Sequence, residues 1–378
     1  MSDEFNDIRP YNDKEIRPVL RQLLKNRSLI SGLRKILLPP CPAFFESPLD
    51  YIVKAYFAAK LIPIRTVAQF QRKIIINTMV EQVFKRTTSS FTISGIENLK
   101  MEYAYIFISN HRDILIDTAM LNYALSRKGF GTAAVAFGDN LMINGFVSDL
   151  IRANKCFIVK RNLPFKQRVL AAHHLSRYIW FLNQQGESVW IAQGDGRAKD
   201  GDDRTSPSLV KMLYLSQRKG GMDFSEYMNQ VHIVPVAVSY EKDPCDLLKA
   251  KELLNNAKYD YETKQQDDLI SMHRGICGDK GRIHIAFGQP LKGNYRSAQE
   301  VALAMDQTIH KLYRLWPTNY IAYDEIRSSK EYAAMYSAQE RREFLARFKN
   351  ESEDLRLKAF AMYARPVINK LALNLQTT

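Results

Sequence analysis

The chain has 378 residues, of which 46% are hydrophobic and 25% are charged. This composition excludes wholesale disorder and suffices to bury one large core or two smaller ones. The 54 Lys and Arg residues exceed the 40 Asp and Glu residues by 14, and this excess indicates an anionic partner, whether nucleic acid, an anionic membrane or a phosphorylated metabolite.

The cysteines and the first residues of the chain favour a cytoplasmic protein. The cysteines contain no C-x-x-C pair, which predicts reduced thiols without zinc or disulfides, and they stand far apart at Cys41, Cys156, Cys245 and Cys277. The sequence MSDEFNDIRP is acidic and polar, unlike a secretory signal. The longest apolar stretch, residues 51–64, is interrupted by Lys54 and Lys60 and falls short of the roughly 18 residues of a spanning helix.

Residues 1–88 are predicted to be helical. Apolar residues at helical spacing predict an amphipathic helix from Ile16 to Leu38. Its other face carries six cations, Arg17, Arg21, Lys25, Arg27, Arg34 and Lys35. Such a helix suits the interface of an anionic membrane, and it suits equally well a position on the protein core with its cations in water. A proline-rich break follows at 39–42, and a second helix is expected over about 65–85.

Residues 89–292 are predicted to form an α/β core with a mixed sheet flanked by helices. Short β-rich runs predict seven strands, at 91–96, 104–109, 132–137, 156–159, 188–192, 232–239 and 282–287. Helical patterns stand between them at 114–125, 146–154, 165–184 and 208–217. The strands are almost continuously apolar, which is typical of strands buried on both faces. Residues 293–378 return to a helical pattern and form a C-terminal extension.

The sharpest motif is N-H-R-D-I-L-I-D, residues 110–117, which follows the second predicted strand and opens a helix. Active sites of α/β folds lie at the carboxyl ends of strands, so His111 is a candidate general base. Asp117, or the nearer Asp113, would hold the imidazole in one tautomer. A histidine that merely caps the helix, with Asp113 in the first turn, fits the same residues.

Two further motifs place cations after strands. The strand at 156–159 is followed by Lys160 and Arg161, and arginine is well suited to bidentate phosphate recognition. The strand at 188–192 runs into the glycine-rich turn Q-G-D-G-R-A-K-D-G, where Gly196 lets backbone N–H groups approach an anion and Arg197 and Lys199 add charge. Taken singly, each also describes solvated charges on an ordinary loop.

The strand at 232–239 contains Pro235. A proline within an apolar strand predicts an edge, a bulge or a bend that lines a ligand site, because it cannot donate to a sheet hydrogen bond.

Together these four motifs resemble the glycerolipid acyltransferase family, whose members acylate glycerol 3-phosphate or lysophosphatidic acid. That family has an N-H-x4-D motif, a strand ending in F-I-[RK]-R, an E-G-x-R-type turn and a strand with an embedded proline. The resemblance spans about residues 91–290, and the segments 8–11 and 240–246 are similar to a bacterial subfamily with an NHRD motif. Two departures stand out: five residues separate His111 from Asp117, and Asp195, preceded by Gly194, replaces the glutamate of the turn.

The resemblance implies a glycerol-3-phosphate acyltransferase-like fold and a catalytic pair of His111 and Asp117. It implies an acyl-CoA or acyl carrier protein donor, a phosphorylated glycerol acceptor, and neither metal nor cofactor. Backbone N–H groups at the start of the helix after His111 are expected to stabilise the oxyanion. The implied substrate-binding residues are Asn110, Arg112, Lys160, Arg161, Asp195, Gly196, Arg197 and Lys199.

The implied setting is phospholipid biosynthesis at an anionic membrane surface, with the protein peripheral on the cytoplasmic, inner face. Two other functions fit the sequence. One is an acyltransferase with an amino-acid or amine lipid acceptor. The other is a non-catalytic basic protein that binds membranes or nucleic acid, although no nucleic-acid partner is expected, since no helix-turn-helix, zinc-finger or RNA-recognition motif is present.

Overall fold

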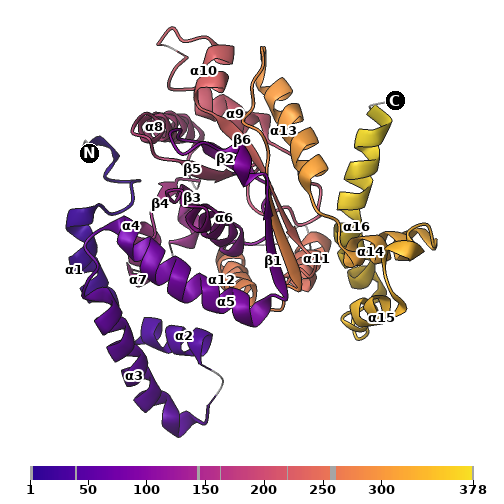
Figure 1. The fold of residues 1–378 in the computed structure, drawn as a ribbon, viewed down its shortest axis with the longest axis horizontal. Helices are drawn as coiled ribbons and strands as arrows, with labels where there is room; N and C mark the ends of the chain where they lie inside the picture. The colour runs from indigo at the N-terminus through magenta and orange to yellow at the C-terminus, as the bar shows by residue number, and fades with distance from the viewer. Residues whose placement is uncertain are drawn as a thin grey trace.

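The computed structural model describes residues 3–38, 41–142, 145–161, 163–218, 220–255 and 261–376. Its centre is a seven-stranded sheet with helices on both faces (Figure 1). The strands are β1 (Ser90–Ser94), β2 (Ile106–Ser109), β3 (Ala134–Gly138), β4 (Cys156–Val159), β5 (Val189–Ala192), β6 (Ile233–Tyr240) and β7 (Arg282–Phe287). All seven expected strands are therefore present, with ends within two residues of the predicted ones.

The sheet is mixed, as the sequence predicts. Its order is β1-β7-β6-β2-β5-β3-β4, and every neighbouring pair is parallel except β6 and β7. The carboxyl ends of β6, β2, β5, β3 and β4 consequently share one edge. Pro235 lies in β6, an interior strand, so the expectation of a sheet edge is wrong. The ladder to β7 begins at the next residue, with Val236 opposite Phe287.

Alternate residues of the buried strands face two separate cores. Ile106 and Ile108 of β2 pack into one core, while Phe107 between them packs into the other. The first core lies beneath α8 (Phe165–Gln184), α9 (Pro207–Tyr214), α10 (Phe224–Gln230) and α13 (Ala298–Leu312). The second lies beneath α5 (Glu81–Thr87), α6 (Ile116–Arg127), α7 (Gly145–Ala153) and α12 (Tyr261–Cys277).

The N-terminal region forms α1 (Asp13–Leu23), α2 (Arg27–Leu37) and α3 (Ala43–Leu61). One helix from Ile16 to Leu38 is thus a wrong prediction, because the side chain of Asn26 accepts from Leu29 N and starts a new helix there. The apolar stripe of α1 and α2 is buried against α3, α7 and the helical run of residues 67–80. Arg34, expected in water, is also buried and bonds to Asp50.

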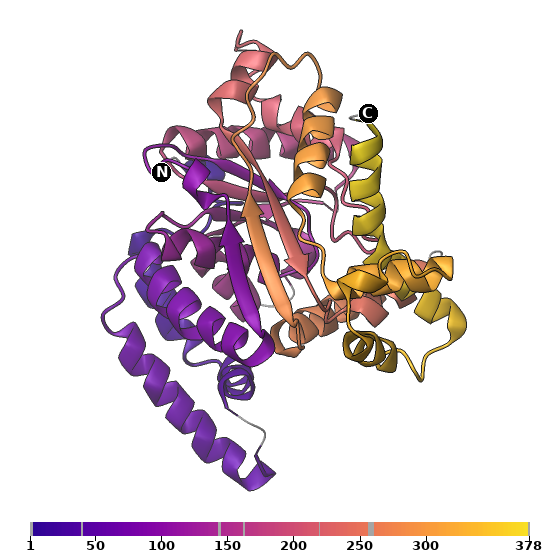
Figure 2. The same ribbon diagram turned by 45° about the vertical axis from the view of Figure 1, so that its right-hand side comes forward.

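The second expected N-terminal helix is present as a continuous run of α4 (Val67–Phe70), the π-helical segment η2 (Gln71–Val80) and α5. Pro39 and Pro40 of the predicted break lie outside the described residues. In both views α2 and α3 project from the body of the molecule (Figures 1 and 2). No helix within the described part of the chain has the length and apolar character needed to cross a bilayer.

The C-terminal helices form a further cluster beside the sheet (Figure 2). The elements of this cluster are α14 (Pro317–Arg327), η5 (Ala333–Met335), α15 (Ala338–Ala346) and α16 (Glu353–Gln376), with α11 (Asp246–Leu254) against them. Helix α13 instead packs on the sheet, as do Phe5 of η1 (Asp3–Phe5) and Ile8. The sheet core therefore draws residues from outside the predicted segment 89–292.

Candidate active site

Three of the four sequence motifs meet at the carboxyl edge of the parallel strands. Ser109 of β2 stands opposite Ala192 of β5, so the loop after each strand starts beside the other. The loops are joined directly, because Ala198 N donates to the carbonyl oxygen of His111 at 2.8 Å. Strand β4 lies two positions from β5 in the sheet, and Lys160 and Arg161 follow it at the same edge.

His111 contacts Asp117 rather than Asp113. Its Nδ1 lies 2.8 Å from Asp117 Oδ2. The five intervening residues are accommodated because helix α6 begins at Ile116, which leaves the preceding segment free to fold back. Asp117 is fully buried, whereas the His111 side chain keeps 14% of its surface exposed. The bond engages Nδ1 and leaves Nε2 for chemistry in the cavity.

Asp113 has a different task, since its Oδ1 accepts from Leu115 N and Ile116 N, each at 2.9 Å, at the start of α6. Burial, and then the charge of Asp117, raise the pKa of the Asp113 carboxyl.

The first backbone N–H groups after His111 are already engaged. Arg112 N and Asp113 N donate to Asp117 Oδ2 at 2.6 and 3.0 Å. Beyond Ile114, the N–H groups of residues 115 and 116 donate to Asp113, as described above. The expectation that this turn supplies the oxyanion donors is therefore wrong for these four groups. They serve to hold the two carboxylates in place.

Asn110 and Arg112 are predicted to bind substrate, yet neither lines a cavity that reaches His111. Asn110 is fully buried and bonds Val238 through both ends of its amide. Arg112 is buried too, and its guanidinium donates to Asp203 at 2.6 Å. Both side chains share Asp203, which draws the His111 loop against the loop after β5.

A cavity of about 1010 Å³ opens at this edge. Its wall contains seven of the predicted site residues, namely His111, Lys160, Arg161, Asp195, Gly196, Arg197 and Lys199. A smaller cavity of about 300 Å³ also reaches His111 and is lined by residues of the glycine-rich turn. His111 thus faces both hollows, an arrangement that suits a reaction between two substrates.

Each of the four predicted anion-binding cations is paired with a carboxylate. The pairs are Lys160 with Asp7, Arg161 with Asp195, Arg197 with Asp268 and Lys199 with Glu252. Arg197 is the most enclosed, since 7% of its side chain is exposed. Arg161 is the most readily released, because its partner Asp195 is 91% exposed at 3.1 Å.

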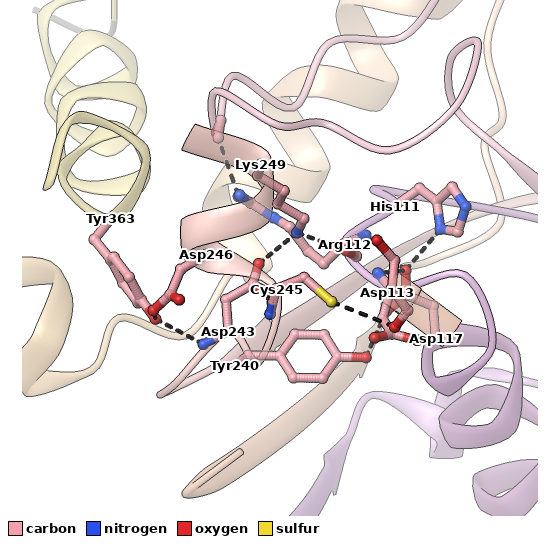
Figure 3. A network of polar contacts seen from close by, with 12 residues as sticks. His111, Arg112, Asp113, Asp117, Tyr240, Asp243, Cys245, Asp246, Lys249 and Tyr363 are labelled. Atoms are coloured by element: carbon pink, nitrogen blue, oxygen red, sulfur yellow. Dashed lines mark hydrogen bonds and ion pairs between the residues drawn. The ribbon is translucent and has the colours of Figure 1, made fainter. Parts of the chain in front are cut away.

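Sequence reasoning missed the acidic partners and the groups behind His111. Asp7, Glu252 and Asp268 line the large cavity, yet each is distant in sequence from its cation. Behind the site, Lys249 Nζ donates to the Arg112 carbonyl oxygen at 2.6 Å and pairs with Asp243 (Figure 3). No local pattern links Lys249 to Arg112, or the three acidic residues to their cations, because these contacts join distant parts of the chain.

Comparison with known proteins gives three findings. Residues 90–239 match the family model described as Acyltransferase. The dihydroxyacetone phosphate acyltransferase of Mus musculus is 23% identical over 218 residues, 56% of this chain and 31% of that protein. The protein of that name from Oryctolagus cuniculus is 22% identical over 217 residues, 56% of this chain and 30% of that protein. The chain therefore matches about a third of the length of these curated relatives.

Among solved structures, the 1-acyl-sn-glycerophosphate (LPA) acyltransferase PlsC from Thermotoga maritima aligns with a TM-score of 0.42 and 14% identity. The alignment covers 78% of this chain and 94% of that chain.

Proposed function

We propose that the chain transfers a fatty acyl group from a thioester donor to the hydroxyl of a phosphorylated glycerol-type acceptor, because residues 90–239 match the family model described as Acyltransferase and the relatives are dihydroxyacetone phosphate acyltransferases. The observation that carries the proposal is the pair of His111 and Asp117 at a cavity lined with cations. The biological setting is phospholipid synthesis.

His111 is the general base of this reaction. Asp117 holds Nδ1, so Nε2 takes the proton from the acceptor hydroxyl as its oxygen attacks the thioester carbonyl. The tetrahedral intermediate collapses with loss of the thiolate, which receives that proton from the imidazolium. The buried carboxylate of Asp117 stabilises the imidazolium in between.

The large cavity supports both halves of this reaction. Apolar side chains in its wall suit an acyl chain, among them Ile8, Leu170, Leu175, Leu209 and Met212. The donor is acyl-CoA or an acyl carrier protein. The cations that line the same cavity suit the acceptor's phosphate, and Arg161 is the foremost of them because its present partner, Asp195, is almost fully exposed to water.

One assay tests the proposal. Purified protein is incubated with labelled acyl-CoA or labelled acyl carrier protein and with single acceptors, and the lipid product is identified. The panel contains glycerol 3-phosphate, lysophosphatidic acid, dihydroxyacetone phosphate, which the curated relatives' name motivates, and amino-acid and amine lipid acceptors. We expect products from a phosphorylated acceptor. Products from the amine acceptors alone would replace the proposal, and no product from any pair would refute it.

Substitutions at Arg161 should act on the acceptor. Arg161→Ala is expected to raise the acceptor KM by about 10- to 100-fold, the equivalent of a charge-assisted hydrogen bond worth roughly 1.5–3 kcal/mol, with little change in the donor KM. Arg161→Lys should restore part of the loss, because lysine lacks the planar fork. Asp195→Asn should lower the acceptor KM, since it frees Arg161. Steady-state kinetics with each substrate varied in turn measure these effects. If all three variants kept the acceptor KM of the unmodified protein, the phosphate would have to bind at another position.

We also propose that the protein is cytoplasmic and docks on the inner face of an anionic membrane through α3. This helix carries apolar side chains on a buried and on an exposed face: Val53 and Phe57 are buried, whereas Phe44 and Tyr51 are 71% and 76% exposed. Ile62, directly after the helix, is 69% exposed. Lys54, Lys60 and Arg65 are exposed beside them and complement anionic headgroups. This surface replaces the stripe of α1 and α2, which is buried.

The docking proposal predicts the behaviour of a triple variant. Tyr51→Ser, Ile52→Ser and Ile62→Ser together should abolish co-sedimentation with vesicles rich in anionic lipid while preserving thermal stability, since all three side chains are exposed. A variant with Leu303→Ser and Met335→Ser, two exposed apolar residues on other elements, should sediment like the unmodified protein. High salt should weaken binding by screening the cations. Undiminished binding of the α3 variant would exclude this surface.

A further inference from the structure

Asp117 is held by more than the His111 loop. Its Oδ2 accepts from the imidazole and from Arg112 N and Asp113 N. Its Oδ1 accepts from the hydroxyl of Tyr240 at 2.5 Å. Among the described residues, no other side chain donates to that oxygen. Tyr240 lies 123 residues away in sequence, at the carboxyl end of the interior strand β6 (Figure 3).

We propose that Tyr240 is a positioning residue for acyl transfer, which sets the rotation and the basicity of the Asp117 carboxylate and through it the protonation of His111. The proposal rests on the proposed function. Tyr240 is buried and lines neither cavity that reaches His111, so it acts through Asp117 rather than on a substrate.

The sheet makes Tyr240 a rigid donor. Its backbone is fixed in the ladder, opposite Ile283 of β7, and its ring packs within the core beneath α6. Burial, and then the charge of Asp117, raise the pKa of the Tyr240 phenol well above its usual range, so it stays a hydrogen-bond donor at every working pH. A donated hydrogen bond withdraws charge from the carboxylate and so limits how strongly Asp117 favours the imidazolium.

Other charged groups surround the carboxylate and set the background of this effect. They are Arg112 and Asp113 in its own loop, Asp243 after β6, Tyr313 after α13 and Lys280 before β7, which is near Asp113. None of these side chains donates to Asp117 in the described structure, and all are retained in the variants below. A change in the titration of His111 in those variants therefore reports the lost hydroxyl.

The test compares two tyrosines of one buried network. Tyr240→Phe removes the donor to Asp117, and Tyr363→Phe removes a buried hydroxyl that bonds Asp246 at 2.9 Å and Asp243 N at 2.7 Å without touching Asp117 (Figure 3). For Tyr240→Phe we expect kcat to fall by about tenfold with KM values unchanged within about twofold. The acid limb of its kcat–pH profile should move up by roughly half a pH unit or more, because a less neutralised carboxylate favours the imidazolium. Tyr363→Phe should lower thermal stability and leave the limb in place.

Two arms keep the outcome decisive. The midpoint of the His111 imidazole resonance is followed by NMR in the free protein, with His111→Ala assigning the signal among seven histidines. It should rise in Tyr240→Phe whatever the acceptor proves to be, so this arm separates failure of the inference from failure of the proposed function. If Tyr240→Phe does not fold, 3-fluorotyrosine at position 240 strengthens the donor and should move the midpoint down. An unmoved midpoint, or an equal shift in Tyr363→Phe, overturns the proposal.

Discussion

Replacing His111 by alanine is expected to lower kcat by about 10²- to 10⁴-fold, the span typical of a positioned general base. The protein should remain folded. Asp117 loses one donor and keeps three, from Arg112 N, Asp113 N and the Tyr240 hydroxyl, so the change in free energy of unfolding should stay within about 1 kcal/mol. Single-turnover acyl transfer and thermal unfolding measure the two quantities.

His174→Ala is the matched control. His174 lines the same cavity, yet its partner is the partly exposed Asp7 at 3.1 Å rather than a buried carboxylate. We expect that variant to turn over within about threefold of the unmodified protein, since an exposed ion pair contributes little. Comparable losses of kcat in both variants would mean that disturbance of the cavity wall, rather than loss of a general base, lowers the activity.

The second large effect is expected for Asp117→Asn, with a loss of kcat on the order of 10³- to 10⁴-fold. All four groups around this carboxylate donate to it, so the site is built for an acceptor without hydrogens. An amide keeps the shape but removes the charge that stabilises the imidazolium, and it presents a donor to one of those groups. The drop should appear in kcat, measured with both substrates saturating.

Asp113→Asn is the control for this change and decides between the two carboxylates that flank His111. Asp113 accepts from two backbone N–H groups at the start of α6, and asparagine is an equally good cap there. Activity and melting temperature should both stay near those of the unmodified protein. If Asp113→Asn were as inactive as Asp117→Asn, loop geometry rather than support of the imidazole would explain both losses.

The ion pairs of the cavity bear on acceptor choice. In the proposed reaction, a phosphate that binds one of these cations competes with the carboxylate paired to it, and the cost of separating the pair rises with burial. Arg197 and Asp268 are both largely enclosed, so removal of Arg197 takes a counter-charge from a largely buried carboxylate and is expected to lower stability as well as activity. Arg161 permits the cleaner experiment because its pair lies at the surface.

The strands and the motifs at their ends were determined by the local sequence. Short runs rich in apolar β-formers, such as 156–159 and 282–287, favour strands of a buried sheet, and their ends coincide with those of β4 and β7. Since parallel strands end at one edge, the motifs after β2, β4 and β5 were bound to gather once the sheet was parallel there. For this reason His111, Arg161 and Arg197 line the same cavity.

Tertiary structure decided which of those residues line the cavity. Asn110 and Arg112 stand in the sharpest motif, yet Asp203, about 90 residues on, draws both into the interior. The partner of each cation, the hydroxyl that Tyr240 gives to Asp117, and the exposure of α3 in place of α1 arise the same way. Periodicity records which face of an element is apolar, and it holds no information on what that face meets, because such contacts join segments that only the folded chain brings together.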